Sequence, residues 1–167
     1  MTPFGLGAVL DHTALAAPRI RDLLPLYRDL LGGEFHDGGD NTRVGYRAVQ
    51  LRYRDGTKTE LMEPLGGSTF FDSFFRRNPQ GGVHHLTFLV PSLHEALAAA
   101  RAAGYSPVGE HLDDDYWQET FLHPREANGT LVQLARKGPA YALVPGLTLD
   151  DVLAGRGVPV GSDVPSP

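Results

Sequence analysis

The sequence predicts an α+β fold built from two tandem βαβββ modules. The first observation is an internal repeat, because a shift of 73 positions places His12 on His85 and Glu60 on Gln133, and each His precedes its Glu or Gln by 48 residues. The second is the order of patterns: each half begins with a β-type segment, continues with apolar residues at helical spacing and ends with a hairpin pattern. Such a repeat indicates two copies of one supersecondary unit.

The first module is predicted to span residues 8–66. Residues 8–16 have a strand pattern, and apolar side chains at helical spacing predict a helix over 18–31, which a glycine pair ends. A short strand is expected at 34–37, followed by a loop through the DGGDN sequence. The module then closes with a hairpin whose strands are 44–54 and 57–63, joined by the turn dipeptide Asp55-Gly56.

The second module is predicted to span residues 81–136, after a connecting segment at 67–80. The connecting segment contains a predicted helix at 68–77, whose four Phe side chains are expected in the core. The elements expected in the second module are a strand at 83–90, a helix at 93–103, a short strand at 107–110, and a hairpin of 116–122 and 130–135. Residues 137–167 are Pro- and Gly-rich and are interpreted as a C-terminal extension with a short helix at 147–153 and a mobile end at 161–167.

Composition limits the possible functions of this 167-residue chain. A net charge of −5 argues against nucleic-acid binding, and the absence of cysteine excludes disulfides and thiolate metal sites. No apolar run reaches the roughly 18 residues of a membrane span, and the first residues lack a signal-peptide pattern. We therefore expect a cytoplasmic protein that acts on a small molecule, without nucleic-acid or membrane partners.

The repeated positions are the candidate metal ligands: His12, Glu60, His85 and Gln133. A single His in a strand is more often a core residue with its hydrogen bonds satisfied than a metal ligand. Here, however, each half of the chain has a His followed at the same spacing by a Glu or Gln, which favours one shared metal site. Imidazole, carboxylate and amide donors suit Co, Zn, Ni, Mn or Fe. The adjacent His84 is expected to point to the opposite face of its strand, because side chains alternate.

The hairpin of the first module supplies most of the candidate substrate contacts. A two-residue turn at Asp55-Gly56 would place Leu51 opposite Glu60. The face that carries Glu60 would then also hold the candidate contacts Arg47, Tyr53 and Met62. Arg47 is expected to anchor an anionic group of the substrate, and Trp117, in the hairpin of the second module, is a further candidate contact.

Five motifs, LDHTALA, ELMEPLG followed by ST, GGVHHLTFLV, FLHP and NGTLVQLA, resemble in order the blocks of the vicinal oxygen chelate (glyoxalase/bleomycin-resistance/dioxygenase) superfamily, and within it the methylmalonyl-CoA epimerase family. The resemblance covers about residues 8–136. It implies a curved mixed sheet around one divalent metal ion, held by the four repeated positions. It also implies a homodimer and a carbonyl or acyl-thioester substrate, whose α-proton is exchanged by carboxylates while the metal stabilises an enolate.

The chain departs from the epimerase pattern at the positions that carry charge. Gln133 stands where that family usually has a carboxylate, Glu60 carries a carboxylate in the first module, and the strand over 45–53 has no acidic residue. Glu60 and Glu119 are therefore the candidate catalytic bases of a metal-dependent isomerase or epimerase. The alternatives are a glyoxalase-type lyase, an Fe(II) ring-cleaving dioxygenase, and a non-catalytic small-molecule binding or resistance protein.

Overall fold

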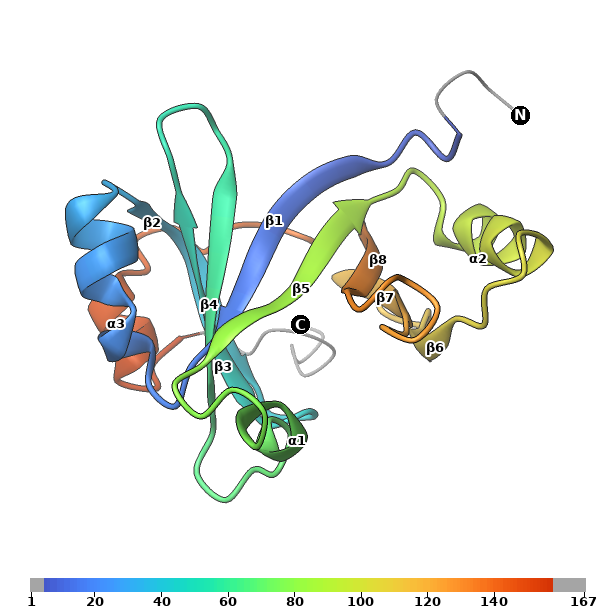
Figure 1. The fold of residues 1–167 in the computed structure, drawn as a ribbon. Coiled ribbons are helices and arrows are strands. Elements are labelled where there is room, and N and C mark those ends of the chain that lie inside the picture. The colour runs from blue at the N-terminus through green and yellow to red at the C-terminus, as the bar shows by residue number, and fades with distance from the viewer. Residues whose placement is uncertain (1–4, 158–167) are drawn as a thin grey trace. The chain divides into compact units, whose positions relative to one another are not determined.

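The computed structural model describes residues 5–157 and contains twice the predicted order of one strand, a helical segment and three further strands (Figure 1). The first copy consists of β1 (Val9–Ala16), η1 (Ile20–Asp22), η2 (Pro25–Leu30), β2 (Glu34–Asn41), β3 (Tyr46–Arg52) and β4 (Lys58–Pro64). The second consists of β5 (Gly82–Leu89), α2 (Leu93–Ala102), β6 (Val108–His111), β7 (Trp117–Leu122) and β8 (Leu131–Lys137). The short helix α1 (Asp72–Phe75) precedes β5, and α3 (Leu149–Leu153) follows β8.

The chain forms two compact units, and strands β1 and β5 pass from one to the other. Unit 1 contains the chain up to His12 together with His85–Ala142, and unit 2 contains Thr13–His84 and the chain from Leu143 onward. Over the described residues the strand order is β2-β3-β4-β1-β5-β8-β7-β6, with parallel β1–β4 and β5–β8 pairs and antiparallel hairpins. The predicted mixed sheet is therefore confirmed.

The internal repeat is preserved in the strand register. Ala14 lies opposite Glu60 in the β1–β4 pair, and Thr87 lies opposite Gln133 in the β5–β8 pair. The shift of 73 residues that relates the two halves converts the first pair into the second at both positions. The equal spacing seen in the sequence thus reflects an equal pairing of strands.

The core of unit 2 lies on one face of β1, β3 and β4 and is covered by η1, η2 and α3. Its buried members are Leu15, Ile20, Leu24, Val49, Leu51, Leu61 and Val152. The predicted helix over 18–31 is confirmed in position but differs in type, because the segment is a 3₁₀ turn followed by a π-helical turn in which the Leu31 amide donates to the Leu26 carbonyl at 2.9 Å. The wider turn changes the phase of the side chains, so Leu30 and Leu31 are exposed while Ile20 and Leu24 are buried.

The β3–β4 hairpin pairs in a different register from the predicted one: Gln50 lies opposite Glu60, and Leu51 lies opposite Thr59. The amide of Tyr53 donates to the carbonyl of Thr57 at 2.9 Å, so the turn has three residues, with Gly56 in the left-handed region at φ +88°. A three-residue turn with glycine in this conformation is common in hairpins. Because side chains alternate, the one-residue change moves the predicted β3 neighbours of Glu60 to the other face.

Two further segments of unit 2 differ from prediction. The DGGDN sequence is part of β2, which pairs with β3 over its whole length and contains a bulge near Asp37; glycine has a low intrinsic strand propensity, but backbone pairing overrides it here. The helix expected over 68–77 is only the four-residue α1. The prediction that the four Phe side chains of this segment lie in the core is partly confirmed. Phe71 is buried with Met62, but Phe70 is 43% exposed.

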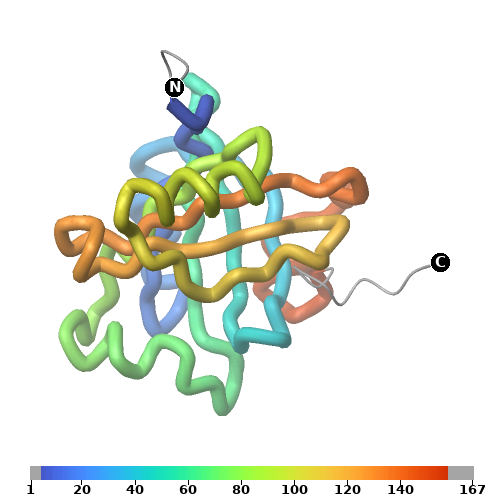
Figure 2. Tube along the Cα trace, turned by 90° about the vertical axis from the view of Figure 1, so that its right-hand side faces the viewer, coloured from blue at the N-terminus to red at the C-terminus, as the bar shows by residue number. Residues whose placement is uncertain are grey.

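Unit 1 contains the remaining strands, and Figure 2 shows β6, β7 and β8 running side by side with α2 beside them. Helix α2 begins where Ser92 accepts a hydrogen bond from the Glu95 amide at 3.3 Å, as expected of an N-cap. Leu93 and Ala96 on its apolar face pack against Leu134 of β8. The second helix and hairpin thus form close to the predicted boundaries.

The C-terminal extension docks on unit 2 through α3 and Arg47. Thr148 and Asp151 form a capping box at the start of α3, and Val152 is fully buried in the core. Arg47 donates to the two carboxylate oxygens of Asp40 at 2.6 and 2.9 Å and to the carbonyl of Leu153 at 3.0 Å. Residues 161–167, predicted to be mobile, lie outside the described residues. None of the helices in residues 5–157 is long and apolar enough to span a membrane.

We expect Arg47→Met to lower the free energy of unfolding by about 2 kcal/mol, since it removes the hydrogen bonds and leaves Asp40 and Glu63 without this cation. Urea denaturation followed by circular dichroism measures the effect. Arg52→Met, on an exposed residue of the same strand, is the matched control. Equal midpoints for the two variants would show that Arg47 does not hold the extension.

Candidate metal and proton-transfer site

His12 lies on β1 and is braced by the preceding residue. Its Nδ1 is 2.7 Å from Oδ2 of Asp11, and both side chains are buried. A carboxylate can only accept a hydrogen bond, so Nδ1 carries the proton and Nε2 is the ring nitrogen that can bind a metal. The Asp11 carboxylate also lies 3.9 Å from Nζ of Lys137. Asp11 thus has the position of an orienting partner for a ligand histidine.

Thr87 connects His12 to Gln133 in the buried part of unit 1. Its side chain is fully buried, and Oγ1 lies 2.9 Å from Nε2 of His12 and donates to Oε1 of Gln133 at 2.5 Å. The hydroxyl has one proton for two acceptors when His12 is neutral. A cation bound by Nε2 and Oε1 would satisfy both acceptors, so the donor set of this unit fits a metal ion.

Glu119 continues this network on β7. The residue is 8% exposed, and its Oε2 accepts hydrogen bonds from Nε2 of Gln133 at 2.6 Å and from the indole Nε1 of Trp117 at 3.1 Å. Phe121 lies opposite Gln133 in the β7–β8 register, and Glu119 is two residues before Phe121. Strand alternation therefore places Glu119 on the face that carries Gln133. A buried carboxylate with two N–H donors is fixed in position.

His85 lies on β5, two residues before Thr87, and is buried. Its ring centroid is 5.8 Å from that of His12 and 6.4 Å from that of Phe121. Unit 1 thus brings together His12, His85 and Gln133, which are three of the four predicted ligands, with the predicted base Glu119.

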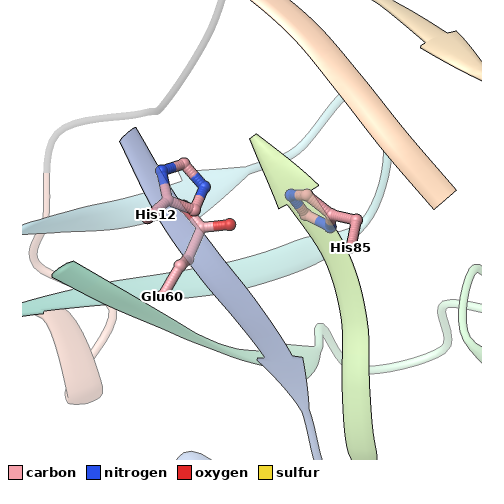
Figure 3. Close-up of side chains that lie close together, drawn as sticks. All are labelled: His12, Glu60 and His85. Carbon is pink, nitrogen blue, oxygen red and sulfur yellow. The ribbon is translucent and has the colours of Figure 1, made fainter. Parts of the chain in front are cut away.

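Glu60, the fourth predicted ligand, belongs to β4 in unit 2. It lies opposite Ala14, which is two residues after His12 on the continuous strand β1, so the three side chains share a face. Gln50 donates from Nε2 to Oε1 of Glu60 at 3.3 Å. Among the described residues, His12, Glu60 and His85 are a group of histidine and carboxylate side chains that could hold a metal ion; Figure 3 shows them on β1, β4 and β5.

His84 has different surroundings from its neighbour His85. Its ring packs against Phe70, Phe71 and Phe74, with centroid distances of 6.1, 5.2 and 5.1 Å. Burial lowers the pKa of His84 to about 4, against an opposing effect of the Glu60 charge. His84 is therefore a neutral aromatic packing residue at neutral pH.

The candidate substrate contacts are distributed over both faces. Arg47 lies on the face of β3 opposite to Gln50. Tyr53 follows β3; its hydroxyl accepts from Thr59, which lies opposite Leu51, and donates to the Tyr27 carbonyl at 3.2 Å. The expectation that Arg47 and Tyr53 share a face with Glu60 is thus wrong, because it assumed the shorter turn. Met62 does share that face, but is only 1% exposed. Trp117 contacts Glu119 through its indole N–H.

Three residues of the site were not predicted: Asp11, Gln50 and Thr87. Thr87 could have been found from the sequence, because it follows His85 by two residues and so shares its face. Asp11 could have been found as the acidic neighbour of a candidate ligand. Gln50 was missed because the predicted hairpin register placed Leu51 opposite Glu60.

The chain is similar to known proteins in both sequence and fold. Residues 11–121 match the model of the Glyoxalase/Bleomycin resistance protein/Dioxygenase superfamily. The chain is 30% identical to the mitochondrial methylmalonyl-CoA epimerase of Dictyostelium discoideum, over 80% of each chain. It is 33% identical to the ethylmalonyl-CoA/methylmalonyl-CoA epimerase of Cereibacter sphaeroides, over 75% of this chain and 95% of that one.

A solved structure of methylmalonyl-CoA epimerase from Mycobacterium tuberculosis superimposes with a TM-score of 0.69 at 25% identity, covering 78% of this chain and 88% of that one. These relatives are enzymes, which agrees with the expectation that the chain is one. Family model, sequence and fold all give the same result, and the chain belongs to the glyoxalase/bleomycin resistance protein/dioxygenase superfamily.

Proposed function

We propose that the chain is a divalent-metal-dependent epimerase that inverts the carbon atom next to a thioester carbonyl, with methylmalonyl-CoA or a close acyl-CoA analogue as its substrate. The observation that carries the proposal is the buried carboxylate of Glu119, which is hydrogen-bonded to Gln133 on the strand face of the candidate ligands. The similarity to methylmalonyl-CoA and ethylmalonyl-CoA epimerases supports the choice of substrate.

The proposed metal ligands are the four repeated positions: His12, Glu60, His85 and Gln133. The equal strand registers of Glu60 and Gln133 support a pseudo-symmetric ligand set, and the donors are of the types that bind Co, Zn, Ni, Mn or Fe. When bound, a divalent cation would polarise the carbonyl oxygen of the substrate and lower the barrier to loss of the α-proton.

Glu119 is the proposed proton acceptor. As the α-C–H bond breaks, the proton passes to the Glu119 carboxylate, and the electron pair of the bond moves toward the thioester carbonyl to give an enolate. Return of a proton from water to the opposite side of the α-carbon inverts it, and Glu119 then releases its own proton to water, which restores the carboxylate. The two N–H groups that hold Oε2 of Glu119 keep the acceptor in one orientation.

Solvent isotope exchange tests the proposal. Protein freed of metal and then loaded with Co²⁺ or Zn²⁺ is incubated in D₂O with one epimer of methylmalonyl-CoA or ethylmalonyl-CoA. We expect one deuterium to enter the α-carbon together with loss of optical purity, at least about 100-fold faster than with the metal-free protein. Mass spectrometry and a stereospecific coupled assay measure the two events.

If the metal-loaded protein exchanges the α-proton of neither thioester, the epimerase proposal is wrong. Conversion of a hemithioacetal by the same sample would then assign the chain to a lyase of the superfamily.

A further inference from the structure

We propose that Tyr141, which follows β8, is a positioning residue that holds Trp117 against Glu119. The inference rests on the proposed role of Glu119 as proton acceptor. All the residues involved belong to unit 1, and Tyr141 lies beyond the part of the chain that matches the superfamily model. The C-terminal extension would thus contribute to the site as well as to the stability of the fold.

Backbone hydrogen bonds fix the start of the extension beside the loop before β7. The amide of Gly138 donates to the carbonyl of Tyr116 at 2.9 Å, and the amide of Ala140 donates to the carbonyl of Asp115 at 2.9 Å. Only glycine fits at position 138, because a Cβ atom there would lie 1.9 Å from the Asp115 carbonyl oxygen. These contacts set the path of the chain that leads to Tyr141.

The ring of Tyr141 is held between neighbours that lead to the site. Its centroid lies 6.2 Å from that of Trp117 and 5.0 Å from that of Tyr116, and Nζ of Lys137 lies 4.4 Å from the centre of the ring. The same ammonium group is 3.9 Å from Asp11, the orienting partner of His12. Aromatic and cation–π contacts of this kind prefer definite geometries and therefore restrict the rotation of the rings.

The direction of the Trp117 ring matters because its single N–H donates to Oε2 of Glu119. Oε2 also accepts from Gln133, so two donors together fix the rotamer of the carboxylate. Removing the Tyr141 ring would free Trp117 to turn, and Glu119 would lose the restraint that the indole N–H provides. Catalysis is sensitive to such small displacements of an acceptor.

Trp117 is the one tryptophan of the chain, so that selectively excited tryptophan emission reports on the surroundings of this side chain. Full-length Tyr141→Ala should show red-shifted emission and at least about twofold stronger quenching by acrylamide, in metal-free protein as well. Its kcat for α-proton exchange should fall about tenfold with KM changed less than twofold, since orientation rather than binding is affected. Tyr141→Phe, which keeps the ring, should have the tryptophan emission and the kcat of the wild-type protein.

Two comparisons separate positioning from a general loss of stability. Tyr105→Ala removes an exposed ring from the same unit and should change neither fluorescence nor kcat. Trp117→Phe removes the N–H but keeps a ring, so it should lower kcat by a similar factor, and adding Tyr141→Ala should cause little further loss. Fully additive losses would indicate independent effects and overturn the proposal.

The proposal is also overturned if Tyr141→Ala keeps wild-type emission and kcat, or if Tyr141→Phe behaves like Tyr141→Ala. Absence of exchange activity in the wild-type protein would refute the role of Glu119, and with it the positioning of a catalytic group, while leaving the fluorescence result as a separate measure of the contact.

Discussion

Glu119→Gln should lower kcat for α-proton exchange by on the order of 10²–10⁴, the range typical for loss of a general base. The substitution keeps an amide oxygen that can accept from Gln133 and Trp117, so the hydrogen-bond network around the site is retained. Only the carboxylate that takes the proton is removed. Metal content, melting temperature and KM should therefore stay near the wild-type values, which steady-state kinetics and metal analysis of the same sample measure.

The matched control for this change is Glu95→Gln, on an exposed residue of α2 in the same unit, which should have wild-type kcat. A Glu119→Gln variant that keeps more than about a tenth of the wild-type kcat would exclude Glu119 as the main acceptor. Glu60 would then be the remaining candidate base.

His85→Ala should abolish stoichiometric binding of a divalent metal, with affinity reduced by more than about 100-fold, because loss of a direct ligand costs at least as much as loss of the groups that orient it. We expect the wild-type protein to bind about one metal ion per chain. Elemental analysis after equilibrium dialysis, together with titration calorimetry, measures stoichiometry and affinity. Circular dichroism checks that the variant remains folded.

The adjacent histidine provides the control for this prediction. His84→Phe keeps an aromatic ring among Phe70, Phe71 and Phe74 and removes the ring nitrogens, so it should bind metal as the wild type does. Full metal occupancy in His85→Ala, or loss of metal in His84→Phe, would show that the ligand assignment is wrong.

Strand periodicity made much of the candidate site predictable from the sequence. His12 and His85, and Glu60 and Gln133, were found from their spacing alone, and the register of β1–β4 and β5–β8 repeats at the same interval. This works because alternation of side chains is a local property of a strand and holds wherever a strand forms. The length of β2 and the shape of the 18–31 segment were mispredicted, since tertiary pairing and packing decided them against local propensity.

The neighbours of each candidate ligand depended on contacts that the sequence does not specify. A single extra residue in the turn at Gly56 exchanged Leu51 for Gln50 beside Glu60 and moved Arg47 to the face where it binds Asp40. The partners of Glu119 likewise depend on β7–β8 pairing and on the path of the chain after β8.

The sequence by itself determined the order of strands and helical segments, because this order follows from periodicities that act over a few residues. It also predicted the four candidate ligands, from equal spacing in the two halves of the repeat. The tertiary structure decided which distant side chains form hydrogen bonds with the predicted site residues: Thr87 with His12, Gln50 with Glu60, and Gln133 with Glu119. Hydrogen bonds between side chains require atoms to meet within about 3 Å, and only strand register, turn length and packing bring distant residues that close.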